Sequence, residues 1–359
     1  MMRINAALLG RMVRRLACRS APDIRTLASR NWTLCPAEET QTPPAIHLPG
    51  EVDRIQGLSP WRERNSELGL IAGGKTSHAA SQAHLLENVE LVGAWLYKGA
   101  AAAQPGYGKR QWLLRNAPPA QRLVETHLIT VSTGSHFFGC LMLDDYPLAL
   151  LPEPGAHCTL MPTQTYPHDA PYRQMLGLAH GTPVERARID KLILYTDFAQ
   201  NSLKARRYEK LRAKLRTCAQ RQTQPGTGVY LRRGRTGELR LLENEAQIEH
   251  TLANLGFEII DQMALSAAEI ARRTLDAPLV VAVEGSQLSH AIYSAAPDAV
   301  FVVLQPPTRF AMAYKEFTDR VGMRFAFLVG EQAAEGFTVS PSHLLRLLDL
   351  VTTMKARAL

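Results

Sequence analysis

An α/β fold is predicted by the region from Gly228 to Pro306, where short apolar segments alternate with helical patterns. One helical pattern separates each apolar segment from the next, and strands joined in this way run parallel with right-handed crossovers. The composition agrees, because 46% hydrophobic and 21% charged residues in a chain of 359 are typical of a soluble globular protein with room for two domains. The predicted strands are residues 229–231, 257–260, 279–283 and 300–304.

The first helix of this region is predicted from its ends. Asn244 followed by Gln247 has the pattern of a capping box, in which two side chains satisfy free backbone N–H groups. Gly256 follows the helical pattern at the C′ position, where a left-handed conformation favours glycine. The stripe expected to be buried comprises Ile248, Leu252 and Leu255.

The later elements follow from similar signals. Ser266 with Glu269 predicts a second capping box, at the start of the next helix. The strand 279–283 is apolar throughout, which is typical of a strand covered on both faces. A third, short helix is expected over residues 287–293, and the prolines at 306 and 307 end the last strand.

Polar residues and one glycine gather at the carboxyl ends of the first and third strands, where open α/β sheets bind their ligands. These residues are Arg232, Arg233, Arg235, Glu284, Gly285 and Ser286. A planar guanidinium can hold two phosphate oxygens at once, so the arginines are candidates for phosphate binding. Because neighbouring strand residues point to opposite faces, at most one of Arg232 and Arg233 is expected to face a ligand, and the other to pair with a carboxylate. Purely structural ion pairs are the alternative.

Two nucleotide-binding motifs are missing from the sequence. No strand is followed by G-x-G-x-x-G, and the chain lacks G-x-x-x-x-G-K-[ST], which argues against a dinucleotide oxidoreductase and a P-loop nucleotidase. Gly285 would allow a ligand to approach the backbone closely, but single glycines in turns are also common for steric reasons. The scattered cysteines, without a C-x-x-C pair, indicate a reducing compartment and no structural zinc. They are Cys18, Cys35, Cys140, Cys158 and Cys218.

The first thirty residues contain seven arginines and one acidic residue, Asp23. This composition fits an organelle transit peptide, a basic arm on a membrane surface or a frayed terminus. Residues 35–60 are rich in Pro, Glu and Thr and are predicted to be a linker or an extended surface segment. No apolar stretch reaches the roughly eighteen residues of a membrane span.

Residues 201–240 hold twelve Lys or Arg residues against Glu209 and Glu238, a local charge of +10. Their helical spacing predicts a buried stripe and a solvated basic face. The stripe is Leu203, Tyr208, Leu211 and Leu215, and the basic face is Lys204, Arg207, Lys210 and Lys214. Binding to anionic lipid, nucleic acid or another acidic polymer is the alternative use of this face.

The N-terminal half is expected to contain strands over residues 90–96, 123–131 and 191–195. Residues 132–136 are expected to form a turn, and the apolar run that follows ends at Asp144 and Asp145. In a strand these two carboxylates would point to opposite sides. They do not form the D-x-D pair that usually holds Mg²⁺ or Mn²⁺ for a diphosphate.

Five blocks in this sequence resemble the catalytic region of glycosyltransferase family 61. They are Val-Tyr-Leu-Arg-Arg ending at Arg233, Arg240 to Glu245, Leu255 to Ile260, Leu265 to Ile270, and Val280 to His290. The family pattern reads approximately as an arginine-ended strand, R-x-x-x-N-E, G-F-E-x-x, L-S-x-x-E-Q and V-G-x-H-G-A-G-L-x-N. A fainter block over residues 143–147 resembles the family's H-W-x-x-D-x-L-P and places Asp144 on its aspartate and Cys140 on its histidine.

The sequence departs from the family pattern at the site itself. Histidine, alanine, glycine and asparagine of the last block are replaced by Glu284, Ser286, Gln287 and His290. Ala271 replaces the glutamine of the family's helix, and His136 lies four residues before the position of the upstream histidine.

The resemblance implies a GT-B-like α/β fold, in which two Rossmann-like domains with parallel sheets face each other across a cleft. It also implies an inverting transferase that needs no metal or other cofactor. The expected parts are a basic arm and linker over 1–45, an acceptor-side domain over 46–221, a nucleotide-sugar domain over 222–335 and a C-terminal helix over 336–359. The expected donor-binding residues are Arg232, Arg233, Arg235, Asn244, Glu245, Gly285, Ser286 and His290.

Three residues are candidates for the base that deprotonates the acceptor hydroxyl. Asp144 is the first, because acceptors bind to the N-terminal side in this architecture, and Glu284 and His136 are the alternatives. Structural roles compete with these assignments: Asp144 could cap the following segment, and Glu284 could pair with a cation.

The implied partners are a nucleotide sugar and a saccharide or lipid-linked saccharide acceptor, as in surface polysaccharide synthesis. A cytoplasmic enzyme with peripheral contact to anionic lipid at the inner membrane face is expected, and nucleic acid is not expected as a partner. A non-catalytic protein that binds nucleotide sugars or saccharides is the alternative, favoured by the substitutions at Glu284 and Ser286.

Overall fold

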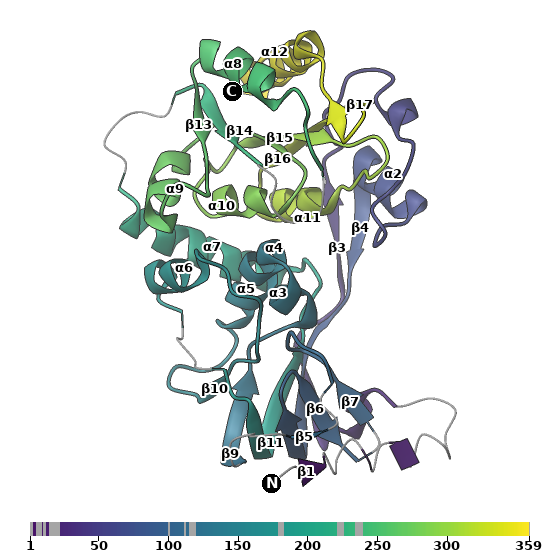
Figure 1. Cartoon of the computed structure of the whole chain (residues 1–359), viewed down its shortest axis with the longest axis vertical. Helices are drawn as coiled ribbons and strands as arrows, with labels where there is room; N and C mark the ends of the chain where they lie inside the picture. The colour runs from purple at the N-terminus through teal and green to yellow at the C-terminus, as the bar shows by residue number, and fades with distance from the viewer. Residues whose placement is uncertain are drawn as a thin grey trace. The chain divides into compact units, whose positions relative to one another are not determined.

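The computed structural model describes residues 22–99, 101–110, 120–178, 183–220, 226–233 and 240–358, together with residues 3, 4, 9, 12, 13, 113 and 114 (Figure 1). The chain forms two compact units. The first unit comprises Met1–Glu38 and Ala79–Arg207, and the second unit comprises Glu39–His78 and Tyr208–Leu359. The expected boundaries after residues 45 and 221 therefore differ from the limits of the compact units.

The second unit contains a five-stranded sheet in the order β13-β12-β14-β15-β16, in which all neighbours are parallel. Its strands are β12 (Gly228–Leu231), β13 (Phe257–Ile260), β14 (Leu279–Val283), β15 (Val300–Gln305) and β16 (Arg324–Val329). The four predicted strands and their parallel pairing are confirmed. The strand β16 was not predicted and extends the sheet at one edge.

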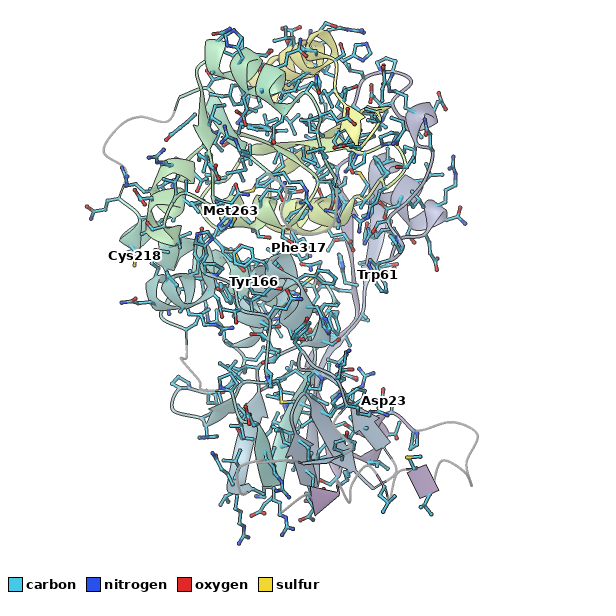
Figure 2. All side chains as sticks on the ribbon, viewed as in Figure 1. Asp23, Trp61, Tyr166, Cys218, Met263 and Phe317 are labelled. Carbon is cyan, nitrogen blue, oxygen red and sulfur yellow. The ribbon has the colours of Figure 1, made fainter. Side chains whose placement is uncertain are left out.

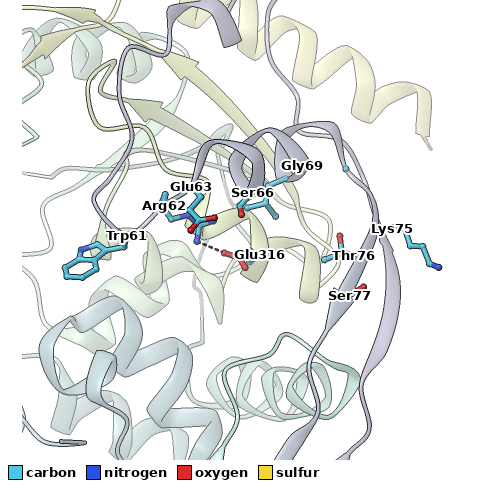
Figure 3. Close-up of a pocket in the computed structure, with 11 residues that line it drawn as sticks. Trp61, Arg62, Glu63, Ser66, Gly69, Lys75, Thr76, Ser77 and Glu316 are labelled. Atoms are coloured by element: carbon cyan, nitrogen blue, oxygen red, sulfur yellow. Dashed lines mark hydrogen bonds and ion pairs between the residues drawn. The ribbon is translucent and has the colours of Figure 1, made fainter. Parts of the chain in front are cut away.

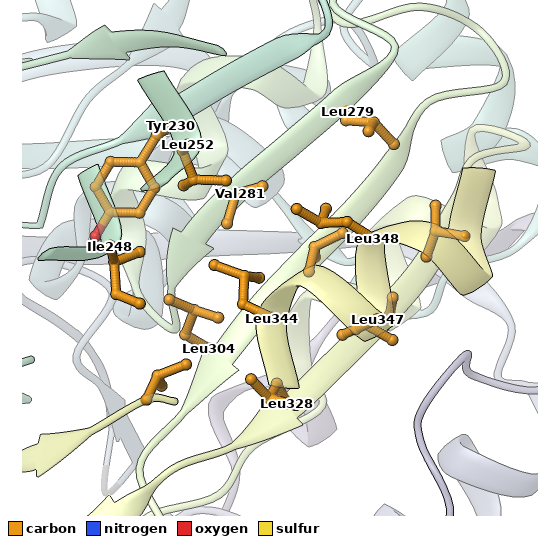
Figure 4. Close-up of a cluster of buried hydrophobic side chains, with 14 of the residues drawn as sticks. Tyr230, Ile248, Leu252, Leu279, Val281, Leu304, Leu328, Leu344, Leu347 and Leu348 are labelled. Atoms are coloured by element: carbon orange, nitrogen blue, oxygen red, sulfur yellow. The ribbon is translucent and has the colours of Figure 1, made fainter. Parts of the chain in front are cut away.

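Helices cover both faces of this sheet. They are α8 (Glu245–Asn254), α9 (Ala267–Thr274), η4 (Ser286–Leu288), α10 (Ser289–Ile292), α11 (Ala313–Arg320) and α12 (Pro341–Ala358). Figure 1 shows α8 and α12 on one face, and α9, α10 and α11 on the other. The main apolar cluster lies between the sheet and the pair α8 and α12, where buried leucines and valines of the three elements pack together (Figure 4).

The ends of these helices test the capping predictions. The capping box of Ser266 and Glu269 is present, and Gly256 adopts the left-handed conformation with a φ of 83°. Asn244 does not cap α8, because its side-chain amide instead pairs with both backbone groups of Val339. Leu255 is 41% exposed, contrary to expectation, because it lies beyond the last turn of α8 and leaves the buried stripe.

The segment 39–78 packs within the second unit. It contains β3 (Glu38–Thr42), η2 (Val52–Arg54), α2 (Arg64–Ala72) and β4 (Gly74–His78). Ile46 exchanges backbone hydrogen bonds with the edge strand β16, donating to Phe325 and accepting from Phe327. The side chains of Ile46 and Leu48 are buried in the core, so the prediction of a linker or surface segment is wrong for these residues. Two short strands, β17 (Glu331–Gln332) and β18 (Phe337–Thr338), complete this unit.

The first unit contains a seven-stranded mixed sheet in the order β10-β9-β11-β5-β6-β7, with β2 also paired to β5. Its strands are β2 (Arg30–Cys35), β5 (Ser81–Val92), β6 (Trp95–Lys98), β7 (Ala101–Ala103), β9 (Gln121–Leu128), β10 (Cys158–Thr159) and β11 (Arg186–Thr196). The expected parallel sheet is wrong here, because short turns join β5, β6 and β7 into antiparallel hairpins. The predicted strand 90–96 is interrupted by the turn at Gly93 and Ala94. A separate antiparallel pair joins β1 (Arg3–Ile4) to β8 (Leu113–Leu114).

Short helical segments follow β9 in the first unit. They are α3 (Ser132–His136), α4 (Phe138–Cys140), the π-helical turn η3 (Leu141–Asp145) and α5 (Tyr146–Leu148), with η1 (Ile24–Leu27) and α6 (Asp169–Leu176) elsewhere. The predicted turn at 132–136 and the placement of Asp144 and Asp145 on opposite sides of a strand are therefore wrong. No helix in the described ranges combines the length and apolar composition needed to cross a membrane.

The basic helix α7 (Ser202–Cys218) differs from the predicted solvated face. The predicted members Lys210 and Lys214 are exposed, but Lys204 and Arg207 are buried. Their positions lie on the same side of the helix as Tyr208 and Leu211, so they turn inward. Each is neutralised by an aspartate of the first unit, as the distances below show.

Candidate functional site

Three arginines converge on one glutamate at the carboxyl edge of the parallel sheet. Arg233 follows β12, Glu284 directly follows β14, and Arg309 follows β15. Nη1 of Arg240 lies 2.6 Å from Oε2 of Glu284, and Nη1 of Arg309 lies 3.8 Å from the same oxygen. Nη1 of Arg233 donates to the main-chain carbonyl of Glu284 at 3.3 Å. We call Arg233, Arg240, Arg309 and Glu284 the arginine cluster.

The turn after β14 is shaped around the Arg233 guanidinium. Gly285 has a φ of 151°, and a Cβ atom at this position would overlap Nη1 of Arg233. Glycine is therefore required where this guanidinium packs against the backbone. Gln287 also binds this guanidinium, because its Oε1 accepts from Nη1 of Arg233 at 3.1 Å. The close approach inferred from Gly285 is thus made by an arginine of the chain itself.

Helix α8 positions the backbone of Arg233. Oε1 of Glu245, in the first turn of this helix, accepts from the Arg233 amide at 3.1 Å and from the Tyr230 hydroxyl at 2.8 Å. Both donors come from β12 or the residues just after it. Glu245 therefore links the start of α8 to the end of β12 and acts on Arg233 by positioning it.

Arg232 occupies a different environment from its neighbour. Its guanidinium binds Glu249 through two nitrogens, at 2.5 and 2.6 Å, and Asp261 at 3.1 Å. Hydrogen bonding to Glu249 raises the pKa of Arg232 above its usual range. The expected separation of the two arginines is confirmed, and Arg232 is the one that pairs with carboxylates.

The electrostatics of the arginine cluster favour an anion. Among the described residues, three guanidinium groups and one carboxylate form the cluster, so cationic side chains predominate in it. Burial, together with the nearby charge of Arg240, lowers the pKa of Arg233 to about 10. A buried cation beside other cations is stabilised when an anion binds, because the anion offsets both the desolvation and the repulsion. A diphosphate is an anion of this kind.

The other expected donor residues are spread around this edge. Ser286 begins η4 and is half-buried, while His290 in α10 is only 2% exposed. Asn244 is engaged by the backbone of Val339. Arg235 lies outside the described residues. Glu245 and Gly285 contact Arg233 of the arginine cluster.

Asp144, the first candidate base, lies in the first unit and is held by a buried lysine. Nζ of Lys204 lies 2.6 Å from Oδ1 of Asp144 and donates to the main-chain carbonyl of Asp197 at 3.3 Å. The Asp197 carboxylate binds Arg207 through both oxygens, at 2.7 and 2.8 Å. Asp144 is therefore anchored to α7 through a buried polar network, and it does not occupy a helix N-cap.

The neighbouring Asp145 is fully buried. Its Oδ1 accepts from the Val131 amide at 3.0 Å, and its Oδ2 has no hydrogen-bond partner among the described residues. Burial raises the pKa of Asp145 well above its usual range, so this carboxyl is held in its neutral form over a wider pH range. Gly134 packs directly against it, since a Cβ there would overlap the carboxyl group.

His136, the remaining candidate base, ends α3 in the first unit. Its ring packs edge-on against Tyr107, with ring centroids 5.0 Å apart. Within the described residues, no group of three His, Cys, Asp or Glu side chains is arranged to hold a metal ion.

Sequence reasoning missed Gln287 and Arg309 and did not assign a role to Arg240. Arg240 stands at the first position of the R-x-x-x-N-E block, which was the available signal. Gln287 appeared only as a departure from the family pattern, and nothing around Arg309 marks it as functional. The tertiary structure brings these three residues to the arginine cluster.

Comparison with known proteins agrees with the geometry of this edge. The family described as Glycosyltransferase 61 matches residues 112–302, which is more than half of the chain and includes Arg233, Arg240 and Glu284. A search of curated proteins found no match. Members of this family transfer a sugar from a donor to an acceptor. The chain belongs to glycosyltransferase family 61 and is a glycosyltransferase.

Proposed function

We propose that the enzyme is an inverting, metal-independent glycosyltransferase that moves a sugar from a nucleotide sugar to a hydroxyl of a saccharide. The second unit binds the donor, and the arginine cluster is the observation that carries this assignment. Three guanidinium groups at the carboxyl edge of a parallel sheet supply the charge and the geometry that a diphosphate needs. The scheme is GT-B-like in that the donor binds to the second unit while the proposed base belongs to the first.

The leaving group is the nucleoside diphosphate, and its negative charge grows as the glycosidic bond to the donor breaks. Guanidinium groups fixed before the reaction stabilise this charge without reorganisation. In this proposal the arginines perform the task for which other transferases use a divalent cation. Glu284 keeps Arg240 and Arg309 in place before the donor binds, and the phosphates then share these arginines.

Inversion requires a base that takes the proton from the acceptor hydroxyl. We assign this role to Asp144, with Lys204 as the positioning residue that orients its carboxylate. Glu284 and His136 remain the alternatives for the base. Asp144→Asn should abolish transfer while leaving donor binding unchanged. Measurable transfer by Asp144→Asn would show that the base is another residue.

The test of the donor site is a thermal-shift screen with UDP-, GDP-, dTDP- and CMP-linked sugars, followed by single-turnover transfer with the donor that stabilises the protein most. Arg240→Gln should weaken binding of that donor by about tenfold or more, because it removes a charged hydrogen bond. Arg273→Gln is the matched control, since Arg273 pairs with Glu258 on the surface of the same unit.

Several outcomes would contradict the proposal. Donor binding without transfer to any acceptor would favour the non-catalytic binding protein. The absence of stabilisation by every nucleotide sugar would overturn the donor assignment. Transfer that requires added Mn²⁺ or stops in EDTA would overturn metal independence, and a product that keeps the anomeric configuration of the donor would overturn inversion.

We further propose that the acceptor belongs to surface polysaccharide synthesis and is presented at the inner membrane face. The exposed Lys210 and Lys214 of α7 support contact with anionic lipid. Sedimentation with vesicles of phosphatidylglycerol should retain the protein at low salt, and the double change to glutamine should reduce that retention. Equal retention on neutral phosphatidylcholine vesicles would contradict it.

A further inference from the structure

The second unit contains a pocket of about 550 Å³ formed by α2, the turn before it, β4 and one residue of α11. Figure 3 shows Trp61 at one end of its lining and Lys75 at the other. Every residue of the lining lies outside the region 112–302 that matches the family. A volume of this size accommodates a ligand of one or two sugar rings.

Trp61 is presented at the pocket by a constrained turn. The Arg62 amide donates to the Ser59 carbonyl at 2.9 Å, which closes a β-turn with Pro60 at its second position. The Ser59 amide donates to Phe310 at 3.0 Å and joins the turn to the loop after β15. Even so, Trp61 is 76% exposed (Figure 2), the largest exposed fraction among the described large hydrophobic side chains. A turn held by two backbone hydrogen bonds thus presents an indole ring to solvent, where much of its apolar surface is uncovered.

The charges of the pocket are balanced. Arg62 binds Glu67 and also Glu316, at 3.0 Å from Nη1 to Oε2. At the other end, Nζ of Lys75 lies 2.6 Å from Oε2 of Glu39. The lining itself contributes two cationic and two anionic side chains, so it offers no net charge to an anion. The balanced charge of this lining differs from the arginine cluster, where cationic side chains predominate. It argues against a phosphate at this pocket.

Hydroxyl groups complete the polar lining. Ser66 lies on α2, and Thr76 and Ser77 lie on β4. Together with the ion-paired side chains they provide both donors and acceptors of hydrogen bonds. An exposed indole beside such groups suits a neutral polyhydroxylated ring, which presents an apolar C–H face to the aromatic ring and hydroxyls at its edge.

We propose that this pocket binds a neutral oligosaccharide, which is the chemical class of the acceptor. The assignment as acceptor rests on the proposed transferase function, but the binding itself does not. Trp61 stacks on one sugar ring, and the polar lining contacts the hydroxyls of the next. The saccharide is thereby held by the same unit that carries the arginine cluster.

Gly69 allows the pocket to be closed without damage to the fold. It lies within α2, lines the pocket, and has open space where a Cβ would lie. Glycine within a helix is unfavourable, so Gly69→Gln should fold at least as well as the wild type while filling the pocket. Ala72→Gln adds the same side chain to an exposed position of α2 outside the lining and is the matched control.

The experiment is saturation-transfer difference NMR on the full chain with xylotetraose, mannotetraose, cellotetraose and chitotetraose. At least one should bind, and Trp61→Ala should reduce its affinity by about tenfold, since an aromatic contact is worth about one such factor. Phe198→Ala removes another exposed aromatic side chain and should have no effect. Gly69→Gln should abolish binding, and Ala72→Gln should not.

Each other result counts against the proposal. Binding that Trp61→Ala and Gly69→Gln leave unchanged places the saccharide elsewhere, and no binding of any tetrasaccharide overturns the assignment. Competition by UMP at the pocket would assign it to a nucleotide. Failure of the donor-site proposal is distinguishable, because Arg240→Gln should leave oligosaccharide binding intact.

Discussion

Nη1 of Arg240 lies 2.6 Å from the Glu284 carboxylate and 3.0 Å from the Glu284 main-chain carbonyl. One guanidinium nitrogen therefore holds both the side chain and the backbone of the residue that follows β14. This contact joins the segment before α8 to the edge of the sheet. Glu284 is the anionic member of the arginine cluster, and its side chain is ion-paired there.

Replacing Glu284 with glutamine should tighten the binding of nucleoside diphosphates. The change removes the negative charge from the arginine cluster, so the charge that faces the phosphates rises by one unit. We expect the dissociation constants of UDP and GDP, measured by calorimetry at pH 7, to fall by about three- to tenfold. Weaker binding would show that the carboxylate itself contacts the ligand, and Glu249→Gln serves as a control outside the cluster.

Two glycine substitutions should change stability in opposite directions. Gly285→Ala should lower the free energy of unfolding by about 1–3 kcal/mol, because alanine tolerates the φ of 151° poorly. The added methyl group also displaces Arg233. Gly69→Ala should raise the free energy by about 0.5–1 kcal/mol, because alanine is the better helix former. Urea denaturation of both variants measures the change in the free energy of unfolding. Changes of the same sign and size would contradict the structural difference between the two positions.

Removing the partner of Asp144 should destabilise the first unit strongly. Lys204→Met leaves a buried carboxylate without its cation, which costs about 3–5 kcal/mol. Lys210→Met changes an exposed lysine of the same helix and should cost less than about 0.5 kcal/mol. Chemical denaturation compares the two. A loss of stability as small as that of the control would show that Asp144 is solvated.

Asp145 should make stability depend on pH with a defined sign. Its pKa in the folded protein is raised by burial, so folding favours proton uptake. The stability that this carboxyl contributes is full below its ordinary pKa of about 4 and is lost as the pH rises through the raised folded value. Asp145→Asn resembles the neutral form and should lack this dependence.

The measurement is the difference in unfolding free energy between Asp145→Asn and the wild type at pH 5 and pH 8. The unfolding free energy of the variant should increase relative to that of the wild type as the pH rises. Histidines whose pKa is lowered by burial, such as His84 and His127, are common to both proteins and cancel in the difference. A difference that is constant between the two pH values would contradict a raised pKa of Asp145.

Much of the second unit could be predicted from local patterns. The strands β12 to β15, the Ser266 capping box and the left-handed Gly256 depend on residues within one or two turns of each other. The same holds for the separation of Arg232 and Arg233, which are adjacent residues directly after β12. Signals of this kind depend on neighbouring residues, so they can be recognised without tertiary structure.

Several errors arose where distant segments compete with a local pattern. Asn244 fits a capping box, but the backbone of Val339 satisfies both of its amide groups. Lys204 and Arg207 fit a solvated helix face, but buried aspartates of the first unit pair with them. The partners of Asn244 and Lys204 lie 95 and 60 residues away in the sequence, and the partner of Arg207 lies 10 residues away, in the segment before α7. None of these partners belongs to the helical pattern from which the prediction was made.

The sequence by itself determined four parallel strands, the helices between them and the presence of Arg233 and Glu284 at the strand ends, because hydrophobic periodicity and capping act over a few residues. Only the tertiary structure decided that Arg240 and Arg309 join Glu284, that segment 39–78 packs against β16, and that Trp61 stands exposed beside a pocket. Such contacts depend on how strand order and loops bring distant residues together. No pattern within a single segment specifies that arrangement.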